Sequence, residues 1–307
     1  MSAEVAPDAP GYESRAAVLA AIVAGELETL KPPVGTPAGV REVPHLVYGL
    51  GGGRDLELDL VLPESEEPGA KPLLVFIHGG AWAGGKREDY RVYQYHFAQR
   101  GYPTATVSYR LVREAIFPAA IEDVKGAIRW LRAQSDVYGY PKDRIVAIGG
   151  SAGGHLAMMA GYADREAGLE GEAGFPLVSS AVQAVVNFYG PCDLTTEFAI
   201  AQESVHRFLG AQYEEEPALY AKASPLTYLD PKDPPTLIVH GSLDEVVPIE
   251  QSDTLAQRLK ENGVAHHYDR LEGWPHSMDV AVPVFERVTV VLENFLETTF
   301  PPETSEP

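Results

Sequence analysis

The sequence predicts an α/β fold, in which helices cover both faces of a doubly wound and mostly parallel sheet. Two observations support this prediction. Short apolar runs alternate with segments of helical period along most of the 307 residues, as in folds built from strand–helix–strand units. In addition, an apolar run at residues 144–148 leads into Gly-Gly-Ser-Ala-Gly and then into helix-forming residues, which predicts a sharp strand–turn–helix.

The chain is expected to have three parts. Residues 1–40 contain an amphipathic helix, with Ser14 as its N-terminal cap and a linker rich in proline and glycine behind it. Residues 41–300 form the sheet domain, and residues 301–307 form a short tail. Within the domain, residues 193–223 are too long for an ordinary connection and too apolar for a disordered one, so they predict a small helical cap.

Each element follows from its local pattern. Strands are expected where apolar residues alternate or cluster, at residues 43–48, 56–62, 73–77, 104–109, 144–148, 182–189, 236–240 and 266–271. Helices are expected where apolar residues recur at helical spacing or helix formers gather, at residues 14–30, 90–100, 118–138, 154–160, 249–262 and 284–296. A glycine-rich turn joins the first two strands, which predicts an antiparallel hairpin ahead of the parallel strands.

Composition limits the partners that the protein can have. The formal net charge is -20 and no basic stretch offsets it, which argues against nucleic acid or an anionic membrane and favours a neutral substrate. Cys192 is the single cysteine, so an internal disulfide is excluded, and it is expected to be a small buried residue. The first residues lack the basic region of a signal peptide. This predicts a cytoplasmic protein, although a secreted protein trimmed of its signal would have the same sequence.

Ser151 is the candidate nucleophile. It occupies the apex of a G-x-S-x-G turn between a strand and a helix, the arrangement called a nucleophile elbow. The serine is expected to have a strained backbone, with Gly149 and Gly153 avoiding side-chain collisions where the strand and the helix crowd together. A serine hydroxyl is a poor nucleophile unless a base removes its proton and a carboxylate orients that base. In an elbow fold, the acid and then the base follow the serine on loops after late strands.

Asp244 and His276 stand where those partners are expected. Asp244 follows the strand predicted at residues 236–240, and His276 follows the strand predicted at residues 266–271. Both therefore lie outside the carboxyl ends of strands, where ligands bind in open α/β sheets. The neighbouring Glu245 remains an alternative for the acid.

Four further histidines are candidates for the role of the base. His266 and His267 are alternatives to His276, but they fall inside a predicted strand. His155 begins the helix behind the nucleophile and His240 ends a buried strand, so both are expected to be structural. No spacing in the sequence matches a zinc or Walker site, so neither a metal nor an organic cofactor is expected.

The negative oxygen that develops during attack on a carbonyl needs hydrogen-bond donors. The backbone N–H of Ala152 follows the nucleophile and is expected to point into the site. Further donors are expected from the backbone of Gly79, Gly80 and Ala81, unless that stretch is a plain glycine turn. Because it follows His78, the stretch resembles the H-G-G-G loop of esterases with alanine as the third residue.

Two tryptophans stand beside the predicted catalytic loops. Trp82 and Trp274 either form walls of the substrate pocket or are core aromatic residues. With Trp82 near the loop that holds the oxyanion and the cap of residues 193–223 above it, a narrow acyl pocket is expected. This arrangement predicts a preference for acetyl to butyryl esters without interfacial activation.

The chain resembles the α/β-hydrolase superfamily, close to the esterase/lipase branch that contains bacterial acetylxylan- and feruloyl-esterase-like proteins. The resemblance covers roughly residues 56–296 and is carried by residues 78–82, 149–156, 187–193, 223–225 and 235–248. The related hormone-sensitive-lipase-like branch usually has Asp before the nucleophile and Asn after the second glycine pair. Gly150 and His155 stand at those positions here, which favours the first branch.

The resemblance implies a serine carboxylesterase that hydrolyses neutral short-chain esters through an acyl-enzyme, including acetyl or feruloyl esters of polysaccharides. Kynurenine-formamidase-like enzymes share much of the motif set, so an arylformamidase-like amidase remains an alternative. A non-catalytic ligand-binding protein on the same fold is a third candidate. The expected partner is a small-molecule ester, with no nucleic acid and no membrane, and the protein is expected to be a monomer or a small homo-oligomer.

Overall fold

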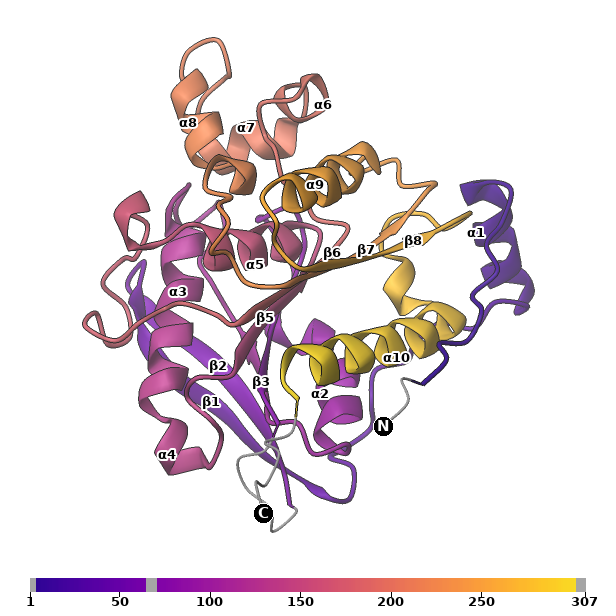
Figure 1. Cartoon of the computed structure of the whole chain (residues 1–307), viewed down its shortest axis with the longest axis horizontal. Helices are drawn as coiled ribbons and strands as arrows, with labels where there is room; N and C mark the ends of the chain where they lie inside the picture. Colours follow the sequence, from indigo (N-terminus) through magenta and orange to yellow (C-terminus); the bar gives the residue numbers. More distant parts are fainter. Residues whose placement is uncertain (1–3, 65–70, 302–307) are drawn as a thin grey trace.

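A sheet in the order β1-β2-β4-β3-β5-β6-β7-β8 runs through the protein (Figure 1). The structure is a computed structural model that describes residues 4–64 and 71–301, so the predicted tail lies outside the described residues beyond Pro301. The strands are β1 (Val40–Gly51), β2 (Arg54–Pro63), β3 (Leu73–Ile77), β4 (Thr104–Val107), β5 (Ile145–Gly150), β6 (Ala184–Phe188), β7 (Thr236–Gly241) and β8 (His266–Leu271). Strand β2 pairs antiparallel with both β1 and β4, and β3 to β8 run parallel, as predicted.

Helices cover both faces of the sheet, which confirms the doubly wound prediction. The main ones are α2 (Arg91–Ala98), α3 (Ala119–Ala133), α5 (Ala152–Tyr162), α9 (Glu250–Glu261) and α10 (Val282–Thr299). Side chains alternate along β3, so Val75 packs in the core with α3, α5 and α9, and Phe76 packs in the core with α2 and α10. The helix predicted at residues 118–138 is divided, because Gln134 leaves helical geometry between α3 and a short α4 (Ser135–Tyr138).

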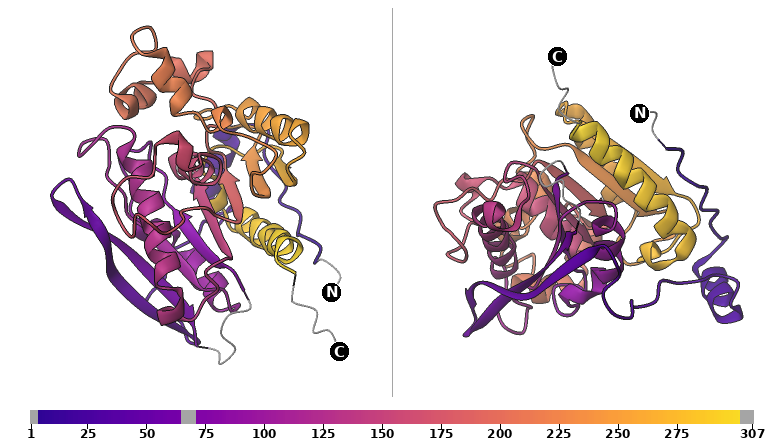
Figure 2. Two further views of the ribbon diagram at one scale, coloured as in Figure 1. Left: turned by 60° about the vertical axis from the view of Figure 1, so that its left-hand side comes forward. Right: turned by 90° about the horizontal axis from the view of Figure 1, so that it is seen from below.

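The N-terminal helix is shorter than predicted. Helix α1 (Arg15–Ala24) begins after Ser14, whose hydroxyl accepts a hydrogen bond from the backbone N–H of Ala17, and this confirms the predicted cap. It ends at Gly25, which has a φ of 74°. This left-handed conformation, which favours glycine, stops the helix well before residue 30. Figures 1 and 2 show α1 at the outer edge of the molecule, beyond β8.

The insertion at residues 193–223 is helical, as predicted. It forms three short helices, α6 (Glu197–Ile200), α7 (Glu203–Leu209) and α8 (Pro217–Lys222), which gather at the top of Figure 1. Phe208 of α7 is buried and stacks on Trp82 with ring centroids 4.3 Å apart, so this contact fixes the cap to the core. None of the helices formed by the described residues is long and apolar enough to cross a bilayer.

Candidate active site

Ser151 lies between the end of β5 and the start of α5. Its φ is 56° and its ψ is -123°, a strained conformation for a residue with a side chain. A Cβ added to Gly149 would lie 2.2 Å from the carbonyl oxygen of Gly153, and one added to Gly153 would lie 2.0 Å from that of Ile77. Both clashes are with backbone atoms, so neither can be relieved by turning a side chain. The predicted reason for the two glycines of the elbow is therefore confirmed.

Three side chains that are distant in the sequence form one line of hydrogen bonds at the carboxyl ends of β5, β7 and β8. Ser151 Oγ lies 3.0 Å from His276 Nε2. His276 Nδ1 lies 2.6 Å from Asp244 Oδ2. The Asp244 carboxylate only accepts, so Nδ1 carries a hydrogen and Nε2 of the neutral ring is left to accept the serine proton. This arrangement can remove the proton from Ser151 as the hydroxyl attacks a carbonyl.

The Asp244 carboxylate is held by four donors. Oδ1 accepts the backbone N–H groups of Val246 and Val247, each at 2.8 Å. Oδ2 accepts His276 and also His240, whose Nε2 lies 2.9 Å away. Burial alone would raise the pKa of Asp244, but the hydrogen bonds from the two imidazoles outweigh it and lower the pKa to about 2.

The neighbouring carboxylate points elsewhere. The Glu245 side chain is 58% exposed and forms an ion pair with Arg15 at 2.7 Å. The structure therefore places Asp244, and not Glu245, against His276.

We expect a single ionisation on the acid side of the pH profile. His276 must be neutral to accept the proton, so kcat/KM should rise with pH on the acid side of the profile. Asp244, with a pKa of about 2, stays ionised between pH 4 and 9. Its depressed pKa stabilises the fold above about pH 4, the ordinary range of a carboxyl group, and this contribution is lost as the pH falls towards 2. Measuring kcat/KM from pH 4 to 9 checks the expectation of a single ionisation, and an acid limb with two coupled ionisations would contradict it.

The loop after β3 lines the site opposite His276. Gly79, Gly80 and Ala81 all border the cavity that contains Ser151. Ala81 has a φ of 52°, so alanine occupies a left-handed position here that glycine would occupy without strain. A Cβ on Gly79 would lie 2.7 Å from the carbonyl oxygen of Gly150, which shows how closely this loop approaches the elbow. Ala152 is buried as the first residue of α5, directly after the serine.

The remaining histidines stand apart from the serine. His155 is fully buried, its Nε2 faces the Ala223 carbonyl at 2.7 Å, and burial lowers its pKa to about 4. His266 and His267 lie in β8, as predicted. His240, expected to be structural, is buried but also contacts Asp244, so it helps to orient the carboxylate through Oδ2, the oxygen that His276 also contacts. Only acceptors, the Asp244 carboxylate and a backbone carbonyl, face its Nε2, which therefore carries the hydrogen.

The cavity at Ser151 has a volume of about 890 Å³. Its lining contains three basic and three acidic side chains, namely Lys31, Lys86, Arg91, Glu88, Asp89 and Asp279. The balance of charge suits a neutral ligand. The cavity also reaches residues 30–33 of the N-terminal segment, a contribution that nothing in the sequence indicated.

Neither Trp82 nor Trp274 is part of the lining of this cavity, although Trp274 borders a smaller hollow beside His276. Trp82 is buried under the cap against Phe208, and its indole N–H points to His155 Nδ1 at 3.3 Å. Trp274 is buried, and its indole N–H donates to the carbonyl of Ala9 at 2.8 Å. Residues 193–223 are also absent from the lining, so the predicted narrow pocket between Trp82 and the cap does not form.

Tyr189 and Asp279 also belong to the site, and neither was predicted from the sequence as a site residue. The Tyr189 ring packs edge-on against His276 with centroids 4.7 Å apart, and its hydroxyl donates to the Asp279 carboxylate. Both side chains are buried, and burial raises the pKa of each. Tyr189 has a φ of 44°, which reflects the tight turn after β6. In the sequence, Tyr189 ends a predicted strand and falls within residues 187–193, which carry the family resemblance, and Asp279 follows His276 by three positions.

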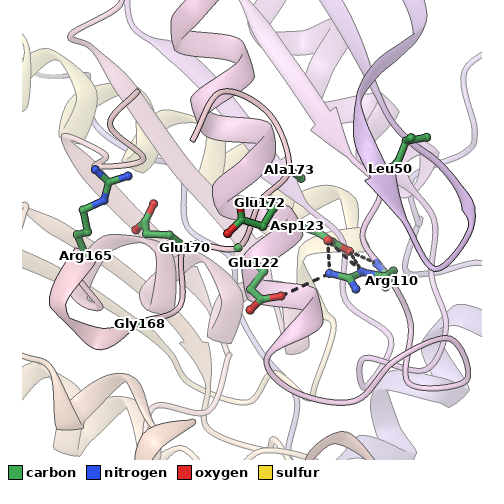
Figure 3. A pocket seen from close by; sticks show the side chains of 10 residues that line it. Leu50, Arg110, Glu122, Asp123, Arg165, Gly168, Glu170, Glu172 and Ala173 are labelled. Atoms are coloured by element: carbon green, nitrogen blue, oxygen red, sulfur yellow. Dashed lines mark hydrogen bonds and ion pairs between the residues drawn. The ribbon is translucent and has the colours of Figure 1, made fainter. Parts of the chain in front are cut away.

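A second hollow, of about 540 Å³, lies far from Ser151, where α3, the loop of residues 165–173 and the β1–β2 hairpin meet (Figure 3). Several of its charged side chains are paired: Arg110 binds both oxygens of Asp123, and Glu170 pairs with Lys125 and Arg129, which are not part of the lining. It holds no arrangement of nucleophile and base. Within the described residues, no group of three or more His, Cys, Asp and Glu side chains is placed to hold a metal ion.

The comparisons with known proteins place the chain in a family. The family model BD-FAE matches residues 58–259, well over half of the chain. Esterase LipQ of Mycobacterium tuberculosis is 33% identical over 257 residues, which cover 81% of this chain and 60% of LipQ. The ethyl acetate hydrolase of Pseudomonas putida is 27% identical over 78% of this chain and 77% of its own length. The chain spans between 50 and 60% of the length of the mycobacterial relatives that it matches.

Solved structures agree with these matches. Esterase 2 of Thermogutta terrifontis, phosphonylated by sarin, superposes with a TM-score of 0.75 at 25% identity, over 89% of this chain and 100% of that chain. The same esterase with butyrate bound gives a TM-score of 0.72. The fold is therefore that of the α/β-hydrolases, and the predicted resemblance is confirmed. Together with the match over residues 58–259, this shows that the chain belongs to the BD-FAE family.

Proposed function

We propose that the protein is a serine carboxylesterase that hydrolyses neutral, short-chain acyl esters through an acyl-enzyme. The observation that carries this proposal is the line of hydrogen bonds from Ser151 through His276 to Asp244, at a strained elbow that opens into a cavity. The names of its relatives, an esterase and an ethyl acetate hydrolase, support the same reaction class. A non-catalytic binding protein would not need this alignment.

In the first half of the reaction, Ser151 Oγ bonds to the ester carbonyl carbon while its proton moves to His276 Nε2. The carbonyl oxygen becomes negative, and in this proposal the backbone N–H groups of Ala152 and of the Gly79–Ala81 loop donate hydrogen bonds to it. Asp244 accepts the hydrogen bond from His276 Nδ1 and stabilises the imidazolium. His276 then returns the proton to the alcohol oxygen as the bond between the carbonyl carbon and that oxygen breaks.

In the second half, water replaces the alcohol. His276 removes a proton from water, which attacks the acyl carbon, and the proton then passes to Ser151 Oγ as the acid leaves. These steps use only this chain's own side chains and backbone. The relative that is phosphonylated by sarin supports an activated nucleophile in this fold, since attack on phosphorus parallels attack on a carbonyl.

A substrate panel tests the proposed function. It contains ethyl acetate, p-nitrophenyl acetate, an acetylated polysaccharide, a feruloyl ester and N-formylkynurenine. The proposal expects hydrolysis of the simple esters, and the two carbohydrate-type substrates decide whether the alcohol is a sugar. Activity on N-formylkynurenine without activity on any ester would replace the esterase by an amidase.

We expect the acyl preference to lie between acetyl and butyryl. The sequence predicted this preference from a narrow pocket under the cap, but the cap does not line the cavity. The charged side chains of the lining supply a different reason for the same preference. Lys86, Glu88 and Asp89 interrupt the cavity wall with charge, so a long alkyl chain would have no continuous apolar channel. The butyrate-bound relative supports a short acyl group. Measuring kcat/KM for p-nitrophenyl esters from acetate to palmitate checks this expectation. A maximum at octanoate or beyond, or a jump in rate above the micelle concentration, would contradict it.

A further inference from the structure

An apolar groove lies beside His276, under helix α1. Its volume is about 210 Å³, and its walls include Leu19 and Ile22 of α1 together with Val246 and Val280 from the loops that carry Asp244 and His276. These four aliphatic side chains are between 38 and 52% exposed. Apolar side chains that are exposed together around one hollow indicate a binding site, whereas apolar residues scattered singly over a surface do not. We call this hollow the α1 groove.

The α1 groove adjoins the cavity that contains Ser151. Four residues line both hollows, namely Val246, His276, Ser277 and Val280. The imidazole that serves the nucleophile therefore stands at the border between them. A ligand group that passes this border leaves the charged lining of the larger cavity and reaches a mainly apolar lining, in which the charged members, Arg15 and Glu245, are paired with each other.

The segment that forms the outer wall is firmly attached to the loop after His276. Thr29 forms a β-bridge with Ala281. The backbone N–H of Leu30 donates to the Val280 carbonyl at 2.7 Å, and that of Val282 donates to the Glu28 carbonyl at 2.9 Å. Helix α1 itself is anchored by buried Val18 and Ala21. The wall and His276 therefore keep a defined relative position, although α1 lies at the outer edge of the molecule (Figure 2).

The path of the proton through His276 determines which part of an ester lies on the side of the α1 groove. His276 Nε2 holds the proton taken from Ser151 Oγ, 3.0 Å away, and returns it to the leaving oxygen. The alcohol part of the ester therefore extends from an oxygen next to His276. The acyl part remains bonded to Ser151, close to the Gly79–Ala81 loop.

We propose that the α1 groove is the subsite for an apolar alcohol group, an aryl or branched alkyl group, of the ester substrate. This inference rests on the proposed esterase function. A cavity of about 150 Å³ lined by aliphatic side chains is enough to hold benzene, so the α1 groove has room for one ring. The N-terminal segment thereby becomes a determinant of specificity and not merely a linker ahead of the domain.

A ratio of rates tests the subsite. Ethyl acetate and phenyl acetate share one acyl group and differ only in the alcohol. Replacing Ile22 by tryptophan fills the groove from the α1 side, so Ile22→Trp should lower the ratio of kcat/KM for phenyl acetate over ethyl acetate at least about tenfold relative to the wild type. Comparing a variant with the wild type cancels the different reactivity of the two leaving groups.

The matched control is Val23→Trp, on the same helix but 89% exposed and outside the groove lining, which should leave the ratio and both rates unchanged. Leu19→Trp, at a more exposed position of the lining, should lower the ratio in the same way and replaces Ile22→Trp if that variant does not fold. A ratio that is unchanged in the folded groove variants overturns the subsite and leaves the esterase proposal standing. A wild-type protein that hydrolyses neither ester overturns both.

Discussion

Replacing Ser151 by alanine is expected to abolish ester hydrolysis, lowering kcat by at least about four orders of magnitude. The variant removes only the hydroxyl oxygen that lies 3.0 Å from His276 Nε2. Alanine keeps the Cβ, so the backbone at φ 56° bears the same strain as in the wild type and the elbow should keep its shape. The measurement is kcat on p-nitrophenyl acetate, with a thermal melt to show that the variant is folded.

The same variant should lose covalent labelling by a fluorophosphonate. In the wild type, Ser151 Oγ forms a bond to phosphorus, fluoride leaves with the bonding electron pair, and His276 takes the serine proton. Mass spectrometry of the intact protein and of its peptides locates the adduct. Labelling that persists on another serine in Ser151→Ala would show that the nucleophile lies elsewhere.

Replacing Asp244 by asparagine is expected to lower kcat by about four orders of magnitude. Asp244 accepts four hydrogen bonds, two from backbone N–H groups and two from imidazoles. An amide has one acceptor oxygen and an NH₂ group, so it cannot satisfy both pairs of donors. If the NH₂ group faces His276, Nδ1 must accept and Nε2 carries the hydrogen, which leaves no acceptor for the proton of Ser151.

Glu245→Gln is the matched control for this prediction. It makes the same chemical change one position along the chain, at a side chain that is exposed and paired with Arg15. An exposed ion pair contributes little, so this variant should keep kcat within about threefold of the wild type. If Glu245→Gln were inactive and Asp244→Asn nearly normal, the assignment of the acid would be reversed.

His240 shows where local pattern and tertiary structure diverge. Its position at the end of a buried strand was enough to predict that it is buried. Its contact with Asp244 depends on the turn after β7, which brings the side chain four positions later back over the strand end. A pattern of apolar residues predicts which positions are buried, but it does not predict which polar groups contact one another inside the core.

The two tryptophans show a similar divergence. Both stand next to catalytic loops in the sequence and both are buried, but Trp274 borders the α1 groove whereas Trp82 packs under the cap. Trp82 has a φ of 55° in the tight loop after β3, and its ring stacks on Phe208 of the cap. Proximity along the chain places a backbone near a site, whereas the turn decides on which side the side chain lies.

By itself, the sequence determined the alternation of strands and helices, the antiparallel hairpin, the helical insertion, the elbow and the loops on which Asp244 and His276 stand. These features follow from local chemistry: apolar period, capping by Ser14, and glycines that only fit where strand and helix crowd together. The tertiary structure alone decided the four donors to Asp244, the packing of Tyr189 against His276 and the cavity at Ser151 with its N-terminal wall. Each of these depends on segments that are distant in the chain and are brought together by the burial of apolar surface, and their separation leaves no periodic signal in the sequence.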